Sequence, residues 1–599
     1  MNFSHVSWKL SLRFRFAIIL LSLASMASLP TIVAQAPPQT KKSAKAKAAS
    51  KPAQSPAWQA VDEARKGNID ALTAYVKAHP ADFDDAMIAY NTGFALETFI
   101  KDNAKDSAKL SGKLTPLADA FASVGPNGRT NFYWAIASSL RKNDALLPFA
   151  ETIARKSVDE VTQADYMAAQ LKEHQAYMKY LADAAAKAGK PKPEESPFDE
   201  QESLDRYRGD MSRRLTILGK IEIKLDEKKA AESDLTRAVE MNSNSDALLN
   251  LAHLAADRGD KPESLRIFTR AYLRGQLKAN EIDEFKKLYF ELHPGDEASL
   301  HQYLNAEYDK SFHNPADATP YHPDPQRSDR AVLLEIFTGA GCESCVSVDL
   351  SADAMLERYS RNELVTLFYQ TSAPTDDPLS NKTVGLREDF YQTHRSAPHT
   401  FIDGQEIQAE GESEKTKEID AKLMGIVDKN LDAAPAAQLH VDATRNGNQV
   451  HVKVTGTSEK LPKTARLQIM LVEKEVDYSG ENGLRYHPMV VRAGANRTDD
   501  NTGYPVTAST ISQDSDFDLD QVTADNLKWY DDYLTALRKR LPPSFEIDGF
   551  KEKKNVMNWD KLAIVAFLQD DKTKQVLQSI YVPVQSGNTT AEVDANHAH

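Results

Sequence analysis

The sequence predicts a multidomain chain with an α-helical region, an α/β domain of element order βαβαββα and a C-terminal, mainly antiparallel β domain. The chain has 599 residues, whereas a single domain usually has about 100 to 200. The spacing of its apolar residues changes from helix-like to strand-like along the chain. Four prolines between Phe312 and Arg330 mark the largest change, because proline interrupts helices.

Residues 58–310 form the predicted helical region, in which apolar residues recur at spacings of three and four. The stretch Leu235-Thr-Arg-Ala returns 33 residues later as Phe268-Thr-Arg-Ala. With the small residues Gly219 and Ala231 before it and Gly259 between the two units, this period resembles tetratricopeptide repeats over about residues 215–275. The resemblance implies a surface that binds a protein partner. Two units are fewer than the roughly three that a free-standing solenoid needs, so neighbouring helices must complete the core.

Residues 311–329 are the predicted proline-rich linker, and residues 330–430 are the predicted α/β domain. The continuous apolar run Ala331–Phe337 indicates a buried strand. A helix through Tyr359, a strand at Leu364–Tyr369 and a helix near 379–393 are expected next. A strand at His399–Ile402, a further short strand and a helix near 413–429 complete the βαβαββα order.

Residues 436–586 form the predicted β-rich domain. Alternating runs surround the turn Asn446-Gly447-Asn448 and recur at Ala465–Val472 and Leu562–Leu568, which favours antiparallel strands. A helical insertion is expected near Ala524–Arg540. Residues 587–599 form a predicted disordered tail.

The two cysteines of the chain both lie in Cys342-Glu343-Ser344-Cys345, after a predicted strand and at a predicted helix start. The free backbone N–H groups of a helix N-terminus favour a thiolate over a thiol, so Cys342 is the expected nucleophile. Cys345 lies one turn further along and can attack a mixed disulfide at Cys342, which releases the partner. The pattern therefore predicts dithiol–disulfide exchange.

A strand, a C-x-x-C helix, a strand, a helix, an X-Pro peptide and a β-hairpin together resemble the thioredoxin superfamily, over about residues 328–430. The run Leu334–Gly339 is similar to secreted bacterial members of the outer-membrane-protein type. The resemblance implies a cis peptide at Ala397-Pro398 beside the cysteines. Active-site support is then expected from Ala397, Pro398, His399, Glu343 and Ser344, and protein clients are expected to bind through mixed disulfides, without a cofactor or a metal.

Some positions depart from that family. A buried acid is expected six residues before the first cysteine, where this chain has Ile336, and the neighbouring Glu335 should point to the other face of the strand. The motif also has Gly341 before it and no histidine within it. An acid at Glu343 and no cation nearby make Cys342 a less stabilised thiolate, which favours a reductase or a modest exchanger over a strong oxidant.

Two other interpretations of the cysteine pair stay open. In an exported protein a C-x-x-C pair can be a stable structural disulfide within a non-enzymatic scaffold. Cys342, Cys345 and His399 could instead hold copper(I), because thiolates suit that ion. By contrast, no second catalytic group stands at a defined spacing from His487 or from the paired Asp376-Asp377. Ordinary turn and surface roles are therefore expected for these residues.

The first residues predict export from a bacterial cell. Lys9, Arg13 and Arg15 precede an apolar run, and Ala34-Gln35-Ala36 offers a peptidase site, so residues 1–36 are the predicted signal peptide. Residues 37–57 are a predicted Lys/Ala/Pro-rich linker, and we expect no membrane-spanning segment after cleavage. The formal charge of -14 is acidic and disfavours a nucleic-acid surface. A periplasmic or other envelope location follows.

Overall fold

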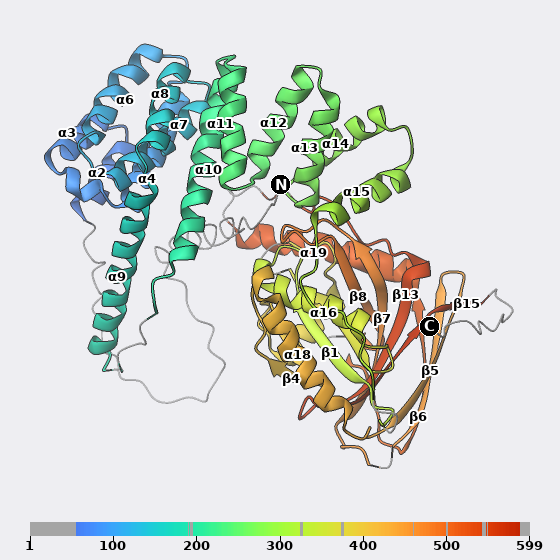
Figure 1. Cartoon of the computed structure of the whole chain (residues 1–599). Helices are drawn as coiled ribbons and strands as arrows, with labels where there is room; N and C mark the ends of the chain where they lie inside the picture. The colour runs from blue at the N-terminus through green and yellow to red at the C-terminus, as the bar shows by residue number, and fades with distance from the viewer. Residues whose placement is uncertain are drawn as a thin grey trace. The chain divides into compact units, whose positions relative to one another are not determined.

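The structure is a computed structural model that describes residues 55–189, 191, 196–323, 327–372, 376–458, 460–498, 501–541, 547 and 549–587. The predicted signal peptide and almost all of the 37–57 linker lie outside these residues, as does the predicted tail beyond residue 587. The predicted fold class is confirmed, with helices first, an α/β segment next and a β-rich segment last (Figure 1). The chain divides into two compact units that meet between Ile267 and Phe268.

The first unit is helical, and its helices begin where capping side chains satisfy free backbone N–H groups. Asp106, Thr162 and Asn244 accept such bonds at the starts of α6, α9 and α12. Its helices are α2 Pro56–Arg65, α3 Ile69–Ala78, α4 Ala86–Ala95, α5 Glu97–Asp102, α6 Ser107–Phe121, α7 Pro126–Lys142, α8 Leu147–Asp159, α9 Gln163–Lys187, α10 Glu200–Lys224, α11 Lys228–Met241 and α12 Ser245–Asp257.

Small residues let α10 and α11 approach closely, as the repeat pattern predicts. A methyl group at Gly219 would lie 2.6 Å from Cγ of Leu235, closer than real side chains come. Ala231 and Ala238 are fully buried at the same contact. Glycine and alanine are therefore required here for packing.

The second unit begins within α13 (Lys261–Leu273) and contains every described strand. Its further helices are α14 Ala279–Leu292, α15 Glu297–Ser311, α16 Val346–Arg358, α17 Lys382–Tyr391, α18 Thr416–Leu431 and α19 Leu519–Arg540. Its longer strands are β1 Val332–Thr338, β2 Leu364–Gln370, β3 His399–Ile402, β4 Gln405–Ile407, β5 Gln438–Asn446, β6 Gln449–Thr457, β7 Ala465–Asp477, β8 Tyr486–Gly494, β12 Thr510–Asp518, β13 Leu562–Asp570 and β14 Val576–Pro583. The two-residue strands are β9 Arg497–Thr498, β10 Asn501–Thr502, β11 Tyr504–Pro505 and β15 Gln585–Ser586. Among the described residues, no helix combines the length and the apolar character needed to cross a bilayer.

One sheet joins the α/β segment to the β-rich segment. Its described strands run in the order β14-β13-β7-β8-β2-β1-β3-β4, with β11 beside β7. Strand β1 is parallel to β2 and antiparallel to β3, and Phe368 of β2 pairs with Val490 of β8. The sequence suggested two separate domains here, at 330–430 and 436–586. In the structure, the edge that β2 would otherwise leave open is paired with β8.

Strand β13 shows why the two segments share a core. Its alternate residues Val565 and Phe567 lie in the same apolar cluster as β1, β2, α16 and α18. Ile564 and Ala566 point the other way, into a cluster with the smaller sheet β12-β6-β5-β15. A strand covered on both faces must be apolar at every position, which explains the continuous run Leu562–Leu568.

We predict that Phe567→Ala destabilises the α/β segment as well as the β-rich segment. Truncating a fully buried phenylalanine costs about 3–5 kcal/mol of unfolding free energy. Hydrogen exchange should accelerate in β1 and β2 together with β13. Val556→Ala is the control, because Val556 is 74% exposed and its truncation should change little. Faster exchange confined to the β-rich strands would show that the two segments unfold independently.

Candidate redox site

The cysteine pair follows directly from the end of β1. All seven residues of β1 are buried, and the chain then turns so that the Cys342 N–H donates to the carbonyl of Gly339 at 2.9 Å. Cys342 precedes a short 3₁₀ turn, Glu343–Cys345, that leads into α16. Cys342 and Cys345 form a disulfide, with their Cα atoms 5.3 Å apart. The predicted position at a helix start is therefore observed.

Both cysteines are buried. Cys342 is 1% exposed and Cys345 is fully covered, whereas Ser344 between them is exposed. The Ser344 hydroxyl lies 3.6 Å from the sulfur of Cys342, within the range of a sulfur hydrogen bond. A serine hydroxyl in this place can donate to a thiolate. Access to the sulfurs, however, requires that covering residues move.

A loop after β4 lies along one side of the motif. The N–H of Gly411 donates to the carbonyl of Ser344 at 2.8 Å, and the N–H of Ser347 donates back to the carbonyl of Gly411 at 3.0 Å. This two-way bridge ties the start of α16 to the chain segment that leads into α18. It also satisfies one of the free N–H groups of the helix start.

A second loop, residues 478–485 between β7 and β8, lies against the turn before Cys342. The backbone N–H of Asn482 donates to the carbonyl of Ala340 at 2.9 Å, and its side-chain amide donates to Gly339 at 3.3 Å. Leu484 joins Val346 and Leu350 of α16 in a small apolar cluster. We call residues 478–485 the covering loop.

Asp377 holds the same turn from inside, a role that sequence reasoning missed. Its carboxylate accepts from the N–H groups of Ala340 at 2.7 Å and Leu379 at 2.8 Å. Burial raises the pKa of Asp377 to about 6. The expected surface role of Asp377 is wrong, because its side chain is only 1% exposed, whereas its bond to the Leu379 N–H two residues on is an ordinary turn contact. No local sequence spacing could reveal the contact with Ala340, which stands 37 positions earlier.

The Ala397-Pro398 peptide is cis, as the resemblance implied. His399 follows it, and its two ring nitrogens lie 2.9 Å from the Ser396 hydroxyl and 2.7 Å from the Glu406 carboxylate. Its imidazole is thus oriented by two neighbours on its own hairpin. Within the described residues, no group of three or more His, Cys, Asp or Glu side chains is arranged to hold a metal ion.

Glu335 lies in a closed polar network. Its carboxylate accepts from the Arg387 guanidinium at 2.8 and 2.9 Å and from the hydroxyls of Tyr369 at 2.9 Å and Tyr391 at 2.6 Å. Glu335 and Arg387 are both fully buried. A carboxylate bonded in this way has no lone pair to spare for a thiol proton.

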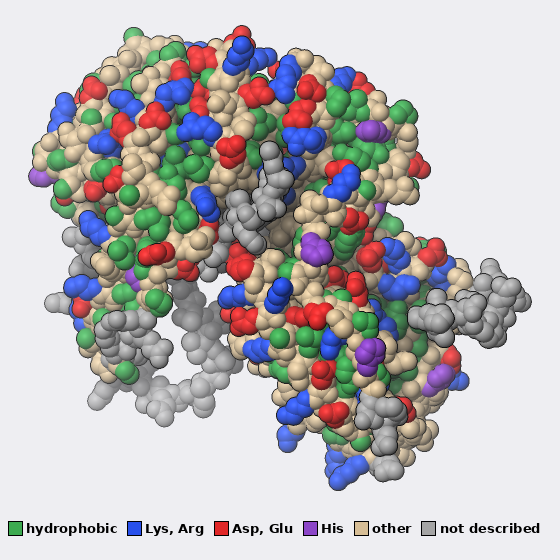
Figure 2. All heavy atoms as spheres, viewed as in Figure 1, with side chains coloured by type: hydrophobic (Ala, Val, Ile, Leu, Met, Phe, Trp, Pro, Cys, Tyr) green, Lys and Arg blue, Asp and Glu red, His purple; other side chains and the backbone are tan. Residues whose placement is uncertain are grey.

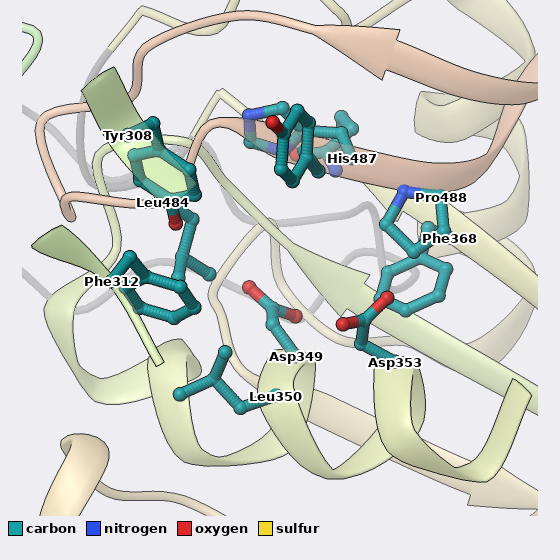
Figure 3. A pocket seen from close by; sticks show the side chains of 11 residues that line it. Tyr308, Phe312, Asp349, Leu350, Asp353, Phe368, Leu484, His487 and Pro488 are labelled. Atoms are coloured by element: carbon teal, nitrogen blue, oxygen red, sulfur yellow. The ribbon is translucent and has the colours of Figure 1, made fainter. Parts of the chain in front are cut away.

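A small cavity with both apolar and polar side chains in its lining lies beside the first turns of α16, with a volume of about 30 Å³. A single water needs about 10–15 Å³ on this measure, so there is space for roughly two. Figure 3 shows the carboxylates of Asp349 and Asp353 pointing into it from α16, with His487 and Leu484 on the opposite side. The carboxyl group of Asp349, one helical turn after Cys345, therefore lines this cavity.

These groups have shifted pKa values because they are buried. Burial raises the pKa of Asp349 to about 8 and that of Asp353 to about 6. The Thr338 hydroxyl donates to one oxygen of Asp349 at 2.7 Å, and the other oxygen has no partner among the described residues. Burial lowers the pKa of His487 to about 4, and its Nε2 lies 2.9 Å from the carbonyl of Tyr478. Asp349 and His487 are thus both neutral at pH 7.

Sequence reasoning did not select Asp349 and expected an ordinary surface role for His487. The latter expectation is wrong, since His487 is 4% exposed and lies within β8. One signal for Asp349 was present. It stands four residues after Cys345 and so on the same face of a helix whose neighbouring residues are mostly apolar.

Comparisons with known proteins give little further guidance. No family model matches the chain, and no curated protein matches it. Among solved structures, a domain of the outer membrane lipoprotein Omp28 from Porphyromonas gingivalis matches with 14% identity and a TM-score of 0.16. The match covers 26% of this chain and 92% of that domain. The functional assignment therefore rests on this chain's own residues and geometry.

We predict that Asp349→Asn flattens the pH dependence of stability between about pH 6.5 and 8. The carboxyl pKa rises from 3.8 to about 8 on folding. Stability from its neutral form is therefore fully present below pH 3.8 and is lost as the pH rises towards 8. The loss is at most about 1.4 kcal/mol per pH unit. Urea midpoints measured across this interval should fall less for Asp349→Asn than for the parent protein.

The matched control is Asp432→Asn, at an exposed aspartate beyond α18. Its midpoints should follow the parent profile. Parallel profiles for the parent and Asp349→Asn would mean that Asp349 is ionised in the folded protein throughout this range.

Proposed function

We propose that this protein is an exported thiol–disulfide oxidoreductase that uses Cys342 and Cys345. The observation that supports it best is a disulfide between the chain's two cysteines, at the point where a buried central strand passes into a helix. The βαβαββα order and the cis peptide at Ala397-Pro398 agree with a thioredoxin-like domain. We assign the protein to the periplasm or another envelope compartment on the basis of its predicted signal peptide.

The proposed chemistry in the reducing direction has two steps. The Cys342 thiolate attacks one sulfur of a client disulfide, and the bond between the two client sulfurs breaks. The leaving client sulfur keeps the electron pair and takes up a proton. Cys345, as a thiolate, then attacks the sulfur of Cys342, the mixed disulfide breaks, and the second client thiolate leaves and is protonated. The protein ends as the Cys342–Cys345 disulfide, and a dithiol donor must reduce it for another turn.

The surrounding residues can assist these steps. The Ser344 hydroxyl is placed to stabilise a thiolate at Cys342. The start of α16 places the positive end of a helix dipole beside the cysteine pair. Glu343, half-buried beside Cys342, opposes that effect. This balance favours a reductase or modest exchanger over a strong oxidant.

The proposed partners are proteins. Client proteins would bind through mixed disulfides, and the tetratricopeptide-like helices would bind a further protein partner. On the face that Figure 2 shows, the described Lys and Arg side chains are interspersed with Asp and Glu and form no continuous basic stripe. With a formal charge of -14, this distribution favours protein partners over nucleic acid.

A second candidate is a non-enzymatic scaffold in which the disulfide is structural. The burial of both cysteines favours it, because a stable disulfide needs no route for a client thiolate. The two candidates differ in what reduction does. Reduction of a structural disulfide should destabilise the fold, whereas a redox-active pair should cycle with the fold intact.

We predict different results for the two cysteine variants. Cys342→Ser should lose the ability to reduce a small peptide disulfide, because it lacks the attacking thiolate. Cys345→Ser should keep the first step and accumulate mixed disulfides, which a non-reducing gel of envelope extracts detects. The double variant controls for non-specific trapping. Equal rates for the parent and both variants, together with no trapped client, would leave the structural disulfide as the function of the pair.

A further inference from the structure

We propose that the covering loop, residues 478–485, is a lid over the disulfide, and that it must open before a client reaches Cys342. This inference rests on the proposed function and concerns the regulation of the same site. The loop comes from the β-rich segment, more than a hundred residues after the cysteines. It therefore links exposure of the sulfurs to the packing of distant parts of the second unit.

The inner side of the loop fits closely against the turn before Cys342. Asn482 donates two hydrogen bonds to this turn, to the carbonyls of Ala340 and Gly339. A methyl group at Gly480 would lie 2.5 Å from the Ala340 carbonyl oxygen, so the two chain segments touch along their backbones. Together with Leu484 on α16, these contacts hold the loop against the turn that leads to Cys342 and the helix that follows Cys345.

Helix α15 holds the outer side of the loop. The Arg485 guanidinium donates to the Asn305 side chain at 2.7 Å, and Asn305 in turn donates to Asp477 at 2.9 Å. Just after the loop, the Tyr486 hydroxyl donates to Asp309 at 2.8 Å. All of these residues belong to the second unit. Helix α15, at the end of the helical region, therefore restrains the loop through these hydrogen bonds.

The loop can move without breaking the sheet. The β7–β8 ladder ends at the pair Asp477 and Tyr486, so residues 478–485 lie beyond it. Two glycines, Gly480 and Gly483, give the loop backbone freedom, and Gly483 has a φ of +84° with open space beside it. The cavity beside Leu484 also means that one side of the loop is not tightly packed. Opening thus costs the hydrogen bonds of the loop and two apolar contacts, that of Leu484 with α16 and that of Tyr478 with Ala340 and Leu379.

The test measures how fast dithiothreitol reduces the disulfide of the full-length oxidised protein, followed by a maleimide gel shift. Gly480→Ala should push the loop off the turn. Asn482→Ala keeps the backbone bond to Ala340 but should remove the side-chain bond to Gly339 and the bond that the amide oxygen accepts from the Leu484 N–H. Asn305→Ala should remove the bonds to Arg485 and Asp477. Each change should raise the population of the open state and the reduction rate by about five- to thirtyfold, the factor that corresponds to one or two lost hydrogen bonds. Urea unfolding of each variant verifies that the protein is folded during the assay.

Matched controls separate local opening from general loosening. Gly425→Ala lies in α18, where an added methyl group meets nothing within 4 Å, and Asn250→Ala lies at a half-buried position of α12 in the first unit. Both should be reduced at the parent rate. A parent rate for all three lid variants would overturn the lid, as would equal acceleration in the controls.

The reduction assay tests the lid separately from the proposed exchange activity. Dithiothreitol reports access to the sulfurs whatever the protein does with clients. Faster reduction of the lid variants without any client trapped by Cys345→Ser would support the lid and refute the exchange activity. Client trapping together with unchanged reduction rates would support the activity and refute the lid.

Discussion

The ion pair between Glu335 and Arg387 lies wholly inside the protein, and several elements around the site meet at it. Glu335 belongs to β1, the strand that ends at the cysteine motif, and Arg387 belongs to α17. The hydroxyl of Tyr391 accepts from Gln569 of β13, which brings the β-rich segment into the same network. Removing one partner of such a pair usually costs about 3–5 kcal/mol, because the other charge stays buried without compensation. The pair therefore constrains β1, α17 and β13 together.

The Glu335–Arg387 pair fixes strand β1, which leads directly into the cysteine motif. Strand β1 has neighbours on both edges and is buried along its whole length. The turn that carries Cys342 then has little freedom, because Asp377 binds it from within and Asn482 binds it from the covering loop. A redox site needs fixed sulfurs and an accessible path to them. The first is provided by the sheet, and the second depends on the loop.

Two buried titratable side chains, Asp349 and His487, lie beside the first turns of α16. Asp349 and His487 are neutral at pH 7 for the same reason, since burial disfavours the charged form of each. Their effects on stability have opposite signs. The neutral Asp349 contributes less as the pH rises towards 8, whereas the neutral His487 contributes less as the pH falls from 6.5 towards 4.

The sequence by itself determined the local features. Apolar spacing predicted the helices, the continuous run before Cys342 predicted a buried strand, and the C-x-x-C spacing predicted a disulfide at a helix start. These features depend on neighbours within a few residues, which the sequence displays directly. Tertiary structure alone decided the pairing of β2 with β8, the burial of both cysteines and the cavity around Asp349. The β2–β8 pairing and most of the cavity wall arise from contacts between residues 340–370 and residues 478–491. A single sequence shows no periodicity that links segments so far apart.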